Sequence, residues 1–191
     1  MQRYPTLSYM KSKFYSLKLL LIISVVFILQ IIIPKFTELF ILNQLAITNF
    51  QFWRYLTSIF LHGSLTHLLF NLIALFFFGI VLEKEIGSRN FLIVFFFSGI
   101  LANLISVNFY PSSLGASGAI YGIIGALTII KPLMMVWTFG LIMPMFIASI
   151  LWVTADVLRT LGAFGQTNIG SIAHLSGIAI GILCGILLRK K

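Results

Sequence analysis

Six long apolar runs separated by polar segments constrain the fold of this chain more than any other feature. Of its 191 residues, 60% are hydrophobic and 9% are charged, whereas soluble domains are about 45–50% apolar and about 25% charged. A membrane-spanning helix needs about 20 mostly apolar residues, so we expect an all-α membrane protein that is a six-transmembrane-helix bundle. The predicted spans are Leu17–Pro34, Ser64–Leu82, Phe91–Val107, Ser117–Ile130, Leu133–Thr154 and Ile169–Leu188.

The distribution of basic residues predicts the orientation of this bundle. Six spans place both termini on one side, which divides the chain into a basic tail (1–16), a membrane domain (17–188) and a basic end (189–191). With the N-terminus in the cytoplasm, ten of the 13 Lys and Arg lie inside, and only Lys35, Arg54 and Arg159 lie outside. Cytoplasmic loops accumulate Lys and Arg. We therefore expect a multi-pass protein of the cell membrane with cytoplasmic termini, whose net charge of +9 reflects topology and not nucleic-acid binding.

The segment Lys35–Gly63 is rich in aromatic residues but is interrupted by polar and charged ones. Such a composition is typical of an interfacial loop with short amphipathic helices. Within it, we expect Trp53 to be a belt aromatic and Arg54 to be a guanidinium that orders the loop. Glu83, after the second span, is expected to hold the start of the next internal loop.

The fourth predicted span is too short to cross a bilayer. Its roughly 14 residues reach about 21 Å at 1.5 Å per residue, against a hydrocarbon core of about 30 Å. The turn Asn108–Gly115 before it must then dip below the external surface. Irregular backbone at that depth is tolerated only when it is buried in protein or lines a water-filled cavity. We therefore expect Ser117 to begin a short central helix at the floor of a hydrated pocket open to the outside.

The three histidines lie at span ends or inside spans, where ionisable residues are costly and indicate function. The second, fourth and sixth spans all run from outside to inside. His62, His67 and Asn71 therefore lie near the external end of the second span, Ser117 begins the fourth, and His174 lies about one turn inside the sixth. Topology and spacing thus gather these groups in one external-facing layer.

A serine, a histidine and hydrogen-bond donors are the parts of an acyl-transfer site. His174 would take the proton of Ser117 as a general base. His67 and Asn71 are four residues apart and share a helix face, so both would donate to an oxyanion, together with the unpaired backbone N–H of Ser117 at its helix start.

A third catalytic residue is not expected from the positions of the acidic residues. Glu83 and Glu85 lie on the opposite side of the membrane, and Asp156 falls in a predicted external turn, Asp156–Asn168. A Ser–His dyad is therefore favoured over a triad.

Glycines at fourfold spacing predict that the fourth and sixth spans touch. Gly118 and Gly122 recur on the fourth span, and Gly177 and Gly181 recur on the sixth. Faces of small residues let membrane helices approach closely. Tyr121, one turn below Ser117, is then expected to pack on the imidazole of His174.

These motifs together resemble the rhomboid intramembrane serine proteases, over about residues 17–188. By that resemblance Ser117 is the nucleophile, His174 the base, Asn71 and His67 oxyanion donors with His62 nearby, and Tyr121 the ring stacked on the base. Gly115, Gly118, Gly177 and Gly181 would support the site, and the substrates would be membrane-anchored proteins cut in or near their transmembrane segments. The matching motifs are Gly115-Ala-Ser117-Gly118, His62-xxxx-His67-xxx-Asn71, Ala173-His174-xx-Gly177-xxx-Gly181, Trp53-Arg54 and Glu83-xxx-Gly87.

A substrate helix would reach this site laterally from the lipid bilayer. The expected gate is the fifth span, with Gly140 and Pro144 as kink points, together with the Asp156–Asn168 turn. We predict no cofactor and no metal. A metal site at His62 and His67 is not expected, since a spacing of five residues turns a helix by about 140° away from a shared face.

Two other functions stay open beside the protease. A non-catalytic protein of the same fold would bind membrane proteins without cutting them, against which the intact Ser117 and His174 argue. A transporter or proton relay would use the buried histidines, but it would be expected to carry more midplane charge and a broken-helix repeat. Cleavage of a model substrate and labelling by a fluorophosphonate separate the three.

Overall fold

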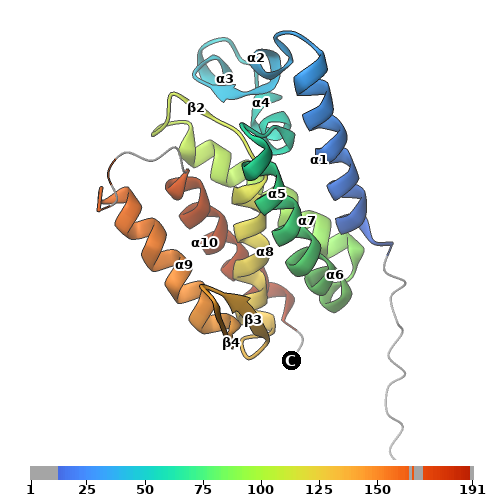
Figure 1. The fold of residues 1–191 in the computed structure, drawn as a ribbon, viewed down its shortest axis with the longest axis vertical. Helices are drawn as coiled ribbons and strands as arrows, with labels where there is room; N and C mark the ends of the chain where they lie inside the picture. The colour runs from blue at the N-terminus through green and yellow to red at the C-terminus, as the bar shows by residue number, and fades with distance from the viewer. Residues whose placement is uncertain (1–12, 164, 166–169, 190–191) are drawn as a thin grey trace, which may run out of the picture.

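Helices packed side by side around a central helix form the scaffold of the protein (Figure 1). The structure is a computed structural model and describes residues 13–163, 165 and 170–189. Most of the predicted basic tail, the last two residues of the basic end and most of 164–169 lie outside the described residues. The mostly helical architecture agrees with the expected helix bundle, although two short two-stranded sheets accompany it.

Among the described residues, four helices are long and apolar enough to cross a membrane. The second predicted span is continuous from Leu65 to Ile86, although a π-helical turn interrupts its α-helical part. The spanning roles of the shorter α8 and α9 stay predictions. The four long helices are α1 (Tyr15–Ile32), the α5–η2–α6 helix (Leu65–Ala74, Leu75–Gly79, Ile80–Ile86), α7 (Ser88–Ser106) and α10 (Ser171–Leu188).

The fifth predicted span is wrong at both ends. Its first part forms a hairpin of β3 (Met135–Thr138) and β4 (Leu141–Pro144), and α9 runs from Met145 to Thr160. Phe139 and Gly140 form the hairpin turn with φ of 52° and 78°, which suits a tight two-residue turn. Gly140 and Pro144 are therefore not helix kinks. An apolar run looks alike in a buried strand and in a helix, so hydropathy alone missed this hairpin.

The first loop contains short helices, as its composition predicts. They are followed along the chain by α5 and lie at the same end of the molecule as β2 (Figure 1). β1 pairs antiparallel with β2 and so joins this loop to the turn before the fourth span. The elements are α2 (Phe36–Phe40), β1 (Leu42–Asn43), α3 (Leu45–Thr48), α4 (Arg54–Thr57), η1 (Ser58–Phe60) and β2 (Ser112–Ser113).

The buried guanidinium of Arg54 orders this loop, as expected. Its NH1 donates to the carbonyl oxygens of Glu38 and Ile41 at 2.8 and 2.7 Å, and its Nε donates to Gln51 Oε1 at 2.6 Å. Burial lowers the pKa of Arg54 from its usual value, but a guanidinium stays charged at any physiological pH. Trp53 is half exposed.

The central helix α8 (Ser117–Ile130) has the predicted bounds and packs against α7, α9, α10 and the α5–η2–α6 helix. Nine of its 14 residues are buried. Its backbone touches that of α10 directly: a Cβ on Gly177 would overlap the carbonyl oxygen of Gly118, and one on Gly181 would overlap that of Gly122. The predicted contact between the two glycine faces is confirmed.

Glu83 joins three helices at the opposite end from the first loop. Its carboxylate is fully buried and accepts from the backbone N–H groups of Tyr15 and Ser16 at 2.8 and 2.9 Å, and from the hydroxyls of Ser16 and Ser88 at 2.8 and 2.6 Å. The expected structural role is therefore wider than one loop, because the carboxylate also caps the start of α1 with a charge-assisted interaction.

Adding one methyl group to the α8–α10 contact should destabilise the fold. Gly181→Ala places a Cβ against the backbone of Gly122, which cannot move aside without separating the helices. We expect unfolding free energy to fall by about 1–3 kcal/mol, measured by dodecyl sulfate titration in mixed micelles. Gly63→Ala is the control, since its nearest neighbour would be Leu114 Cδ1 at 3.6 Å. Equal stability of the two variants would contradict the contact.

The carboxylate of Glu83 is expected to matter far more than a neighbouring one. Glu83→Gln leaves a buried N–H or hydroxyl without its acceptor, which costs about 1–3 kcal/mol. Glu85→Gln is the matched control, because Glu85 pairs with Lys131 at 2.7 Å where both side chains are over a third exposed, and such pairs contribute about 0–1 kcal/mol. The same titration measures both, and an equal loss in the two variants would refute the capping role.

Candidate active site

Ser117 is the first residue of α8 and follows an unusual backbone turn. Gly115 has φ of +121°, a value that L side chains rarely adopt, and its N–H donates to the carbonyl of Ser58 at 2.9 Å. The turn is thereby tied to η1. The hydroxyl of Ser117 is thus presented at a helix start, where backbone N–H groups lack partners within the helix.

His174 lies one turn inside α10, beside the contact between the two glycine faces. Its ring stacks on that of Tyr121 with the centroids 4.2 Å apart and the planes 10° apart, so the expected stacking is present. Ser117 precedes Gly118 and His174 follows Ala173, and a Cβ on Gly118 would lie 3.5 Å from the Ala173 carbonyl oxygen. Ser117 and His174 are therefore neighbours across the contact between α8 and α10, although no hydrogen bond joins them in the described part of the chain.

His67 and Asn71 of α5 face the turn before Ser117. A Cβ on Gly115 would lie 2.8 Å from His67 Nε2 and 3.8 Å from Asn71 Nδ2. Only a glycine therefore fits at position 115. Asn71 is buried, and its Nδ2 has no hydrogen-bond partner among the described residues. A buried donor without a partner calls for an explanation, and a ligand oxygen beside Ser117 would supply one.

His62 packs behind His67. Its side chain is buried, and the two rings lie 4.9 Å apart. His62 precedes Ser64, whose side chain caps α5 by accepting from His67 N–H at 3.1 Å. The expectation that the two histidines lie on different faces of one helix is therefore wrong, because His62 is outside the helix. Within the described residues, no three His, Cys, Asp or Glu side chains gather in a way that would hold a metal ion.

The imidazole of His62 is neutral at physiological pH. Burial, reinforced by the charge of a protonated His67, lowers its pKa to about 4. Its Nδ1 lies 3.3 Å from the carbonyl of Phe60, and its backbone exchanges two hydrogen bonds with the side-chain amide of Gln30, at 2.9 and 3.2 Å. Gln30, which sequence reasoning missed, thus fixes the entry to α5 from α1.

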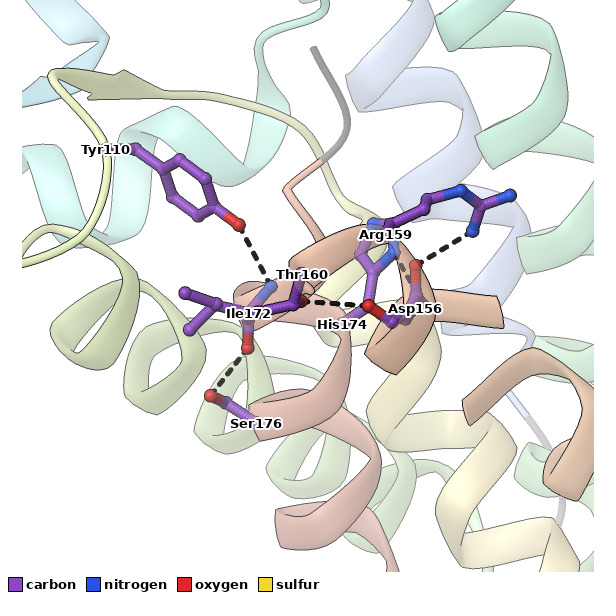
Figure 2. A network of polar contacts seen from close by, with 7 residues as sticks. All are labelled: Tyr110, Asp156, Arg159, Thr160, Ile172, His174 and Ser176. Carbon is purple, nitrogen blue, oxygen red and sulfur yellow. Dashed lines mark hydrogen bonds and ion pairs between the residues drawn. The ribbon is translucent and has the colours of Figure 1, made fainter. Parts of the chain in front are cut away.

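Asp156 is the main residue that sequence reasoning misplaced. It lies inside α9, not in an external turn, and its fully buried carboxylate contacts His174: Oδ2 lies 3.1 Å from Nδ1. Its other oxygen accepts from Arg159 NH1 at 3.0 Å. Figure 2 shows the three side chains together. The prediction ended this helix at Thr154, whereas α9 continues to Thr160. A helix extended by these residues would have carried Asp156, the acidic residue of positions 133–160.

Tyr110 holds the start of α10 by a hydrogen bond to its backbone (Figure 2). Its hydroxyl oxygen accepts the backbone N–H of Ile172 at 3.1 Å, one of the groups that a helix start leaves unpaired. Tyr110 belongs to the turn that leads to Ser117. The same segment therefore positions the starts of both α8 and α10, a coupling that no local pattern in the sequence indicates.

Comparison with known proteins gives consistent relatives. A family model described as the Rhomboid domain matches residues 49–191. YdcA of Bacillus subtilis (strain 168), by its name a candidate rhomboid protease, is 35% identical over 151 residues, or 78% of this chain and 73% of YdcA. Rhomboid-like protease 3 of Toxoplasma gondii is 34% identical over 148 residues, or 76% of this chain and 55% of that protein. Rhomboid protease GlpG of Salmonella paratyphi A is 29% identical over 146 residues, or 71% and 48%.

The chain thus spans most of YdcA and about half of the other two relatives. The family model includes every element from α4 onward, and with them the serine, the three histidines and both glycine faces. The helices that are long and apolar enough to cross a membrane agree with this match. The chain is therefore an integral membrane protein that belongs to the rhomboid family of intramembrane proteases.

Proposed function

We propose that this protein is an intramembrane serine endopeptidase in which Ser117 is the nucleophile and His174 the general base. The observation that carries the proposal is the position of His174. Its ring is stacked on Tyr121, which lies one helical turn after Ser117, at the close contact of α8 and α10. A serine at a helix start and an imidazole held beside it are the parts of nucleophilic catalysis. Hydrogen bonds of a catalytic pair often form only with substrate bound.

The reaction proceeds through an acyl-enzyme. Ser117 Oγ attacks the carbonyl carbon of the scissile bond, its proton passes to His174 Nε2, and the carbonyl electrons move onto oxygen. The carbonyl then re-forms and the C–N bond breaks, as the imidazolium gives its proton to the leaving amine. The acyl group remains on Ser117 Oγ as an ester. Water adds to this ester by the same steps, with His174 taking its proton and returning it to Ser117 Oγ.

The negative oxygen of the intermediate is held by donors next to Gly115. Asn71 Nδ2, which has no partner among the described residues, and the ring of His67 approach this turn from α5, and the backbone N–H of Ser117 approaches from α8. Donors already in place stabilise developing charge without reorganisation. Glycine at position 115 leaves the space that they need, and His62 supports His67 from behind.

The substrates are membrane-anchored proteins cut in or near a transmembrane segment, which must unwind locally because the carbonyls of a helix are already paired. The site opens to the external side and both termini are cytoplasmic. Two observations support this orientation of the site. α2–α4 and β2 lie at the end of the molecule where α8 begins (Figure 1). The charges predicted to be cytoplasmic belong to the opposite end, with Lys84 late in α6 and Lys131 directly after α8.

We infer that α9 is the gate for a substrate helix. Phe78 of η2 and Trp152 of α9 meet edge to face with ring centroids 5.8 Å apart, a contact of about 0.5–1.5 kcal/mol. Toward the core, α9 is held by polar contacts, among them Thr128–Ser149 at 2.6 Å. The helix can therefore part from η2 at low cost while it stays attached to α8.

Ser117→Ala should abolish cleavage without unfolding the protein. Removing the attacking oxygen is expected to lower the cleavage rate of a model single-pass substrate in proteoliposomes by about 10³-fold or more, and to abolish fluorophosphonate labelling. Ser112→Ala, on the exposed strand β2, is the control and should keep both.

Cleavage that persists in Ser117→Ala would refute the assignment of the nucleophile. A wild-type protein that neither cleaves nor labels would refute the protease, and would leave a non-catalytic binder of membrane proteins or a transporter in its place.

A cross-link across the gate should block protein substrates only. Phe78→Cys and Trp152→Cys are joined by a short bifunctional thiol reagent in a Cys184→Ala background, which removes the native cysteine. We expect cleavage of the transmembrane substrate to fall at least about tenfold, while the small fluorophosphonate still labels Ser117. The two single-cysteine variants, treated alike, are the controls. Undiminished cleavage in the cross-linked protein would exclude this gate.

A further inference from the structure

We propose that Asp156 is a positioning residue of the active site, so that this protein works with Ser117, His174 and Asp156 rather than with a serine and a histidine alone. The inference rests on the proposed function, because it concerns the base of that same reaction. The contact that carries it joins a carboxylate oxygen of Asp156 to the ring nitrogen of His174 that does not serve the serine.

The geometry is that of a carboxylate orienting an imidazole. Asp156 Oδ2 lies 3.1 Å from His174 Nδ1, and the carboxylate is completely shielded from solvent, while the imidazole is 11% exposed. The two residues come from α9 and α10 and are 18 positions apart. Figure 2 shows the carboxylate between His174 and Arg159. A contact this close across two helices holds the ring by its edge, while Tyr121 holds it by its face.

The pairing selects the useful tautomer of the neutral ring. An ionised carboxylate only accepts hydrogen bonds, so Nδ1 must carry the proton in this contact. Nε2 is then left as the proton acceptor, which is the form that a general base for Ser117 needs. Without the carboxylate, both tautomers become available and the ring is free to turn away from Tyr121.

The same contact favours the charged state formed during the reaction. When His174 takes the serine proton, the positive charge appears beside a carboxylate that is itself shielded from solvent, where the attraction is stronger than in water. Asp156 keeps its own charge throughout, because Arg159 donates to Oδ1 at 3.0 Å. The charged and titratable side chains near His174 are Asp156 and Arg159 from α9, Tyr121 from α8 and His67 from α5.

A purely structural role is the rival explanation. Asp156 links α9 to α10, and any link of that kind could hold α9 in place. The chain offers a comparison: Ser149 of α9 is also buried and is bonded to Thr128 of α8 at 2.6 Å, away from the site. A residue that merely attaches α9 should behave like Ser149, whereas a positioning residue should change the chemical step.

The test compares Asp156→Asn with Ser149→Ala in the full-length protein in proteoliposomes. Asparagine keeps the size of the side chain but removes the charge and can donate to Nδ1, which favours the wrong tautomer. We expect kcat for the model transmembrane substrate to fall by about 10²–10⁴-fold with KM within about threefold. The rate of fluorophosphonate labelling should fall by a similar factor. Ser149→Ala should lower stability and leave kcat within about threefold.

Three outcomes would overturn the inference: wild-type kcat in Asp156→Asn, a loss of activity that only follows the loss of folded protein, or an equal loss in Ser149→Ala. Should Asp156→Asn not fold because the charge of Arg159 is no longer balanced by the carboxylate at this site, Asp156→Asn/Arg159→Gln removes both charges and is expected to show the same fall in kcat. An active wild type with an inactive Ser117→Ala keeps the proposed function, so full activity of Asp156→Asn would then refute the triad alone.

Discussion

The direct contact between the backbones of α8 and α10 is the constraint on which the rest of the structure depends. It forms because Gly177 and Gly181 of α10 and Gly125 of α8 have no side chains: a Cβ on any of the three would overlap backbone atoms of the other helix. In lipid, such packing takes the place of the hydrophobic effect. This contact between α8 and α10 sets the distance between Ser117 at the start of α8 and His174 near the start of α10. Any residue that pushed the helices apart would therefore weaken the fold and separate Ser117 from His174.

Buried charged side chains and buried neutral side chains differ in how completely they are paired. Glu83 and Arg54 are surrounded by partners, at 2.6–2.9 Å in each case, as the cost of burying a charge requires. In the part of the chain that the structure describes, four buried side-chain atoms have no partner: His62 Nε2, Asn71 Nδ2, Ser98 Oγ and Ser171 Oγ. Of these, Asn71 Nδ2 lies beside Gly115, in the turn that leads to Ser117. The buried charges are thus fully paired, whereas a neutral donor next to Ser117 is left without a partner.

Sequence reasoning succeeded where a residue's surroundings follow from helix periodicity and failed where they follow from chain reversal. The bounds of α8, the glycine contact and the stacking of Tyr121 on His174 were all expected, because each depends on spacing within one or two helices. The hairpin before α9 was missed, since its residues are as apolar as a span. That single error moved the end of α9 by several residues. It placed Asp156 in a turn and hid its contact with His174.

The sequence by itself determined that the chain enters a membrane, and which helices hold the serine, the histidines and the glycines. These properties depend on the apolar composition and on the period of the helix, which are local. Only the tertiary structure decided that α9 carries a carboxylate to His174, that Gln30 and Tyr110 anchor the starts of α5 and α10, and that the rings of His62 and His67 touch. Those contacts join residues far apart or on either side of a turn, and their partners are chosen by how the helices pack, which no spacing along the chain encodes.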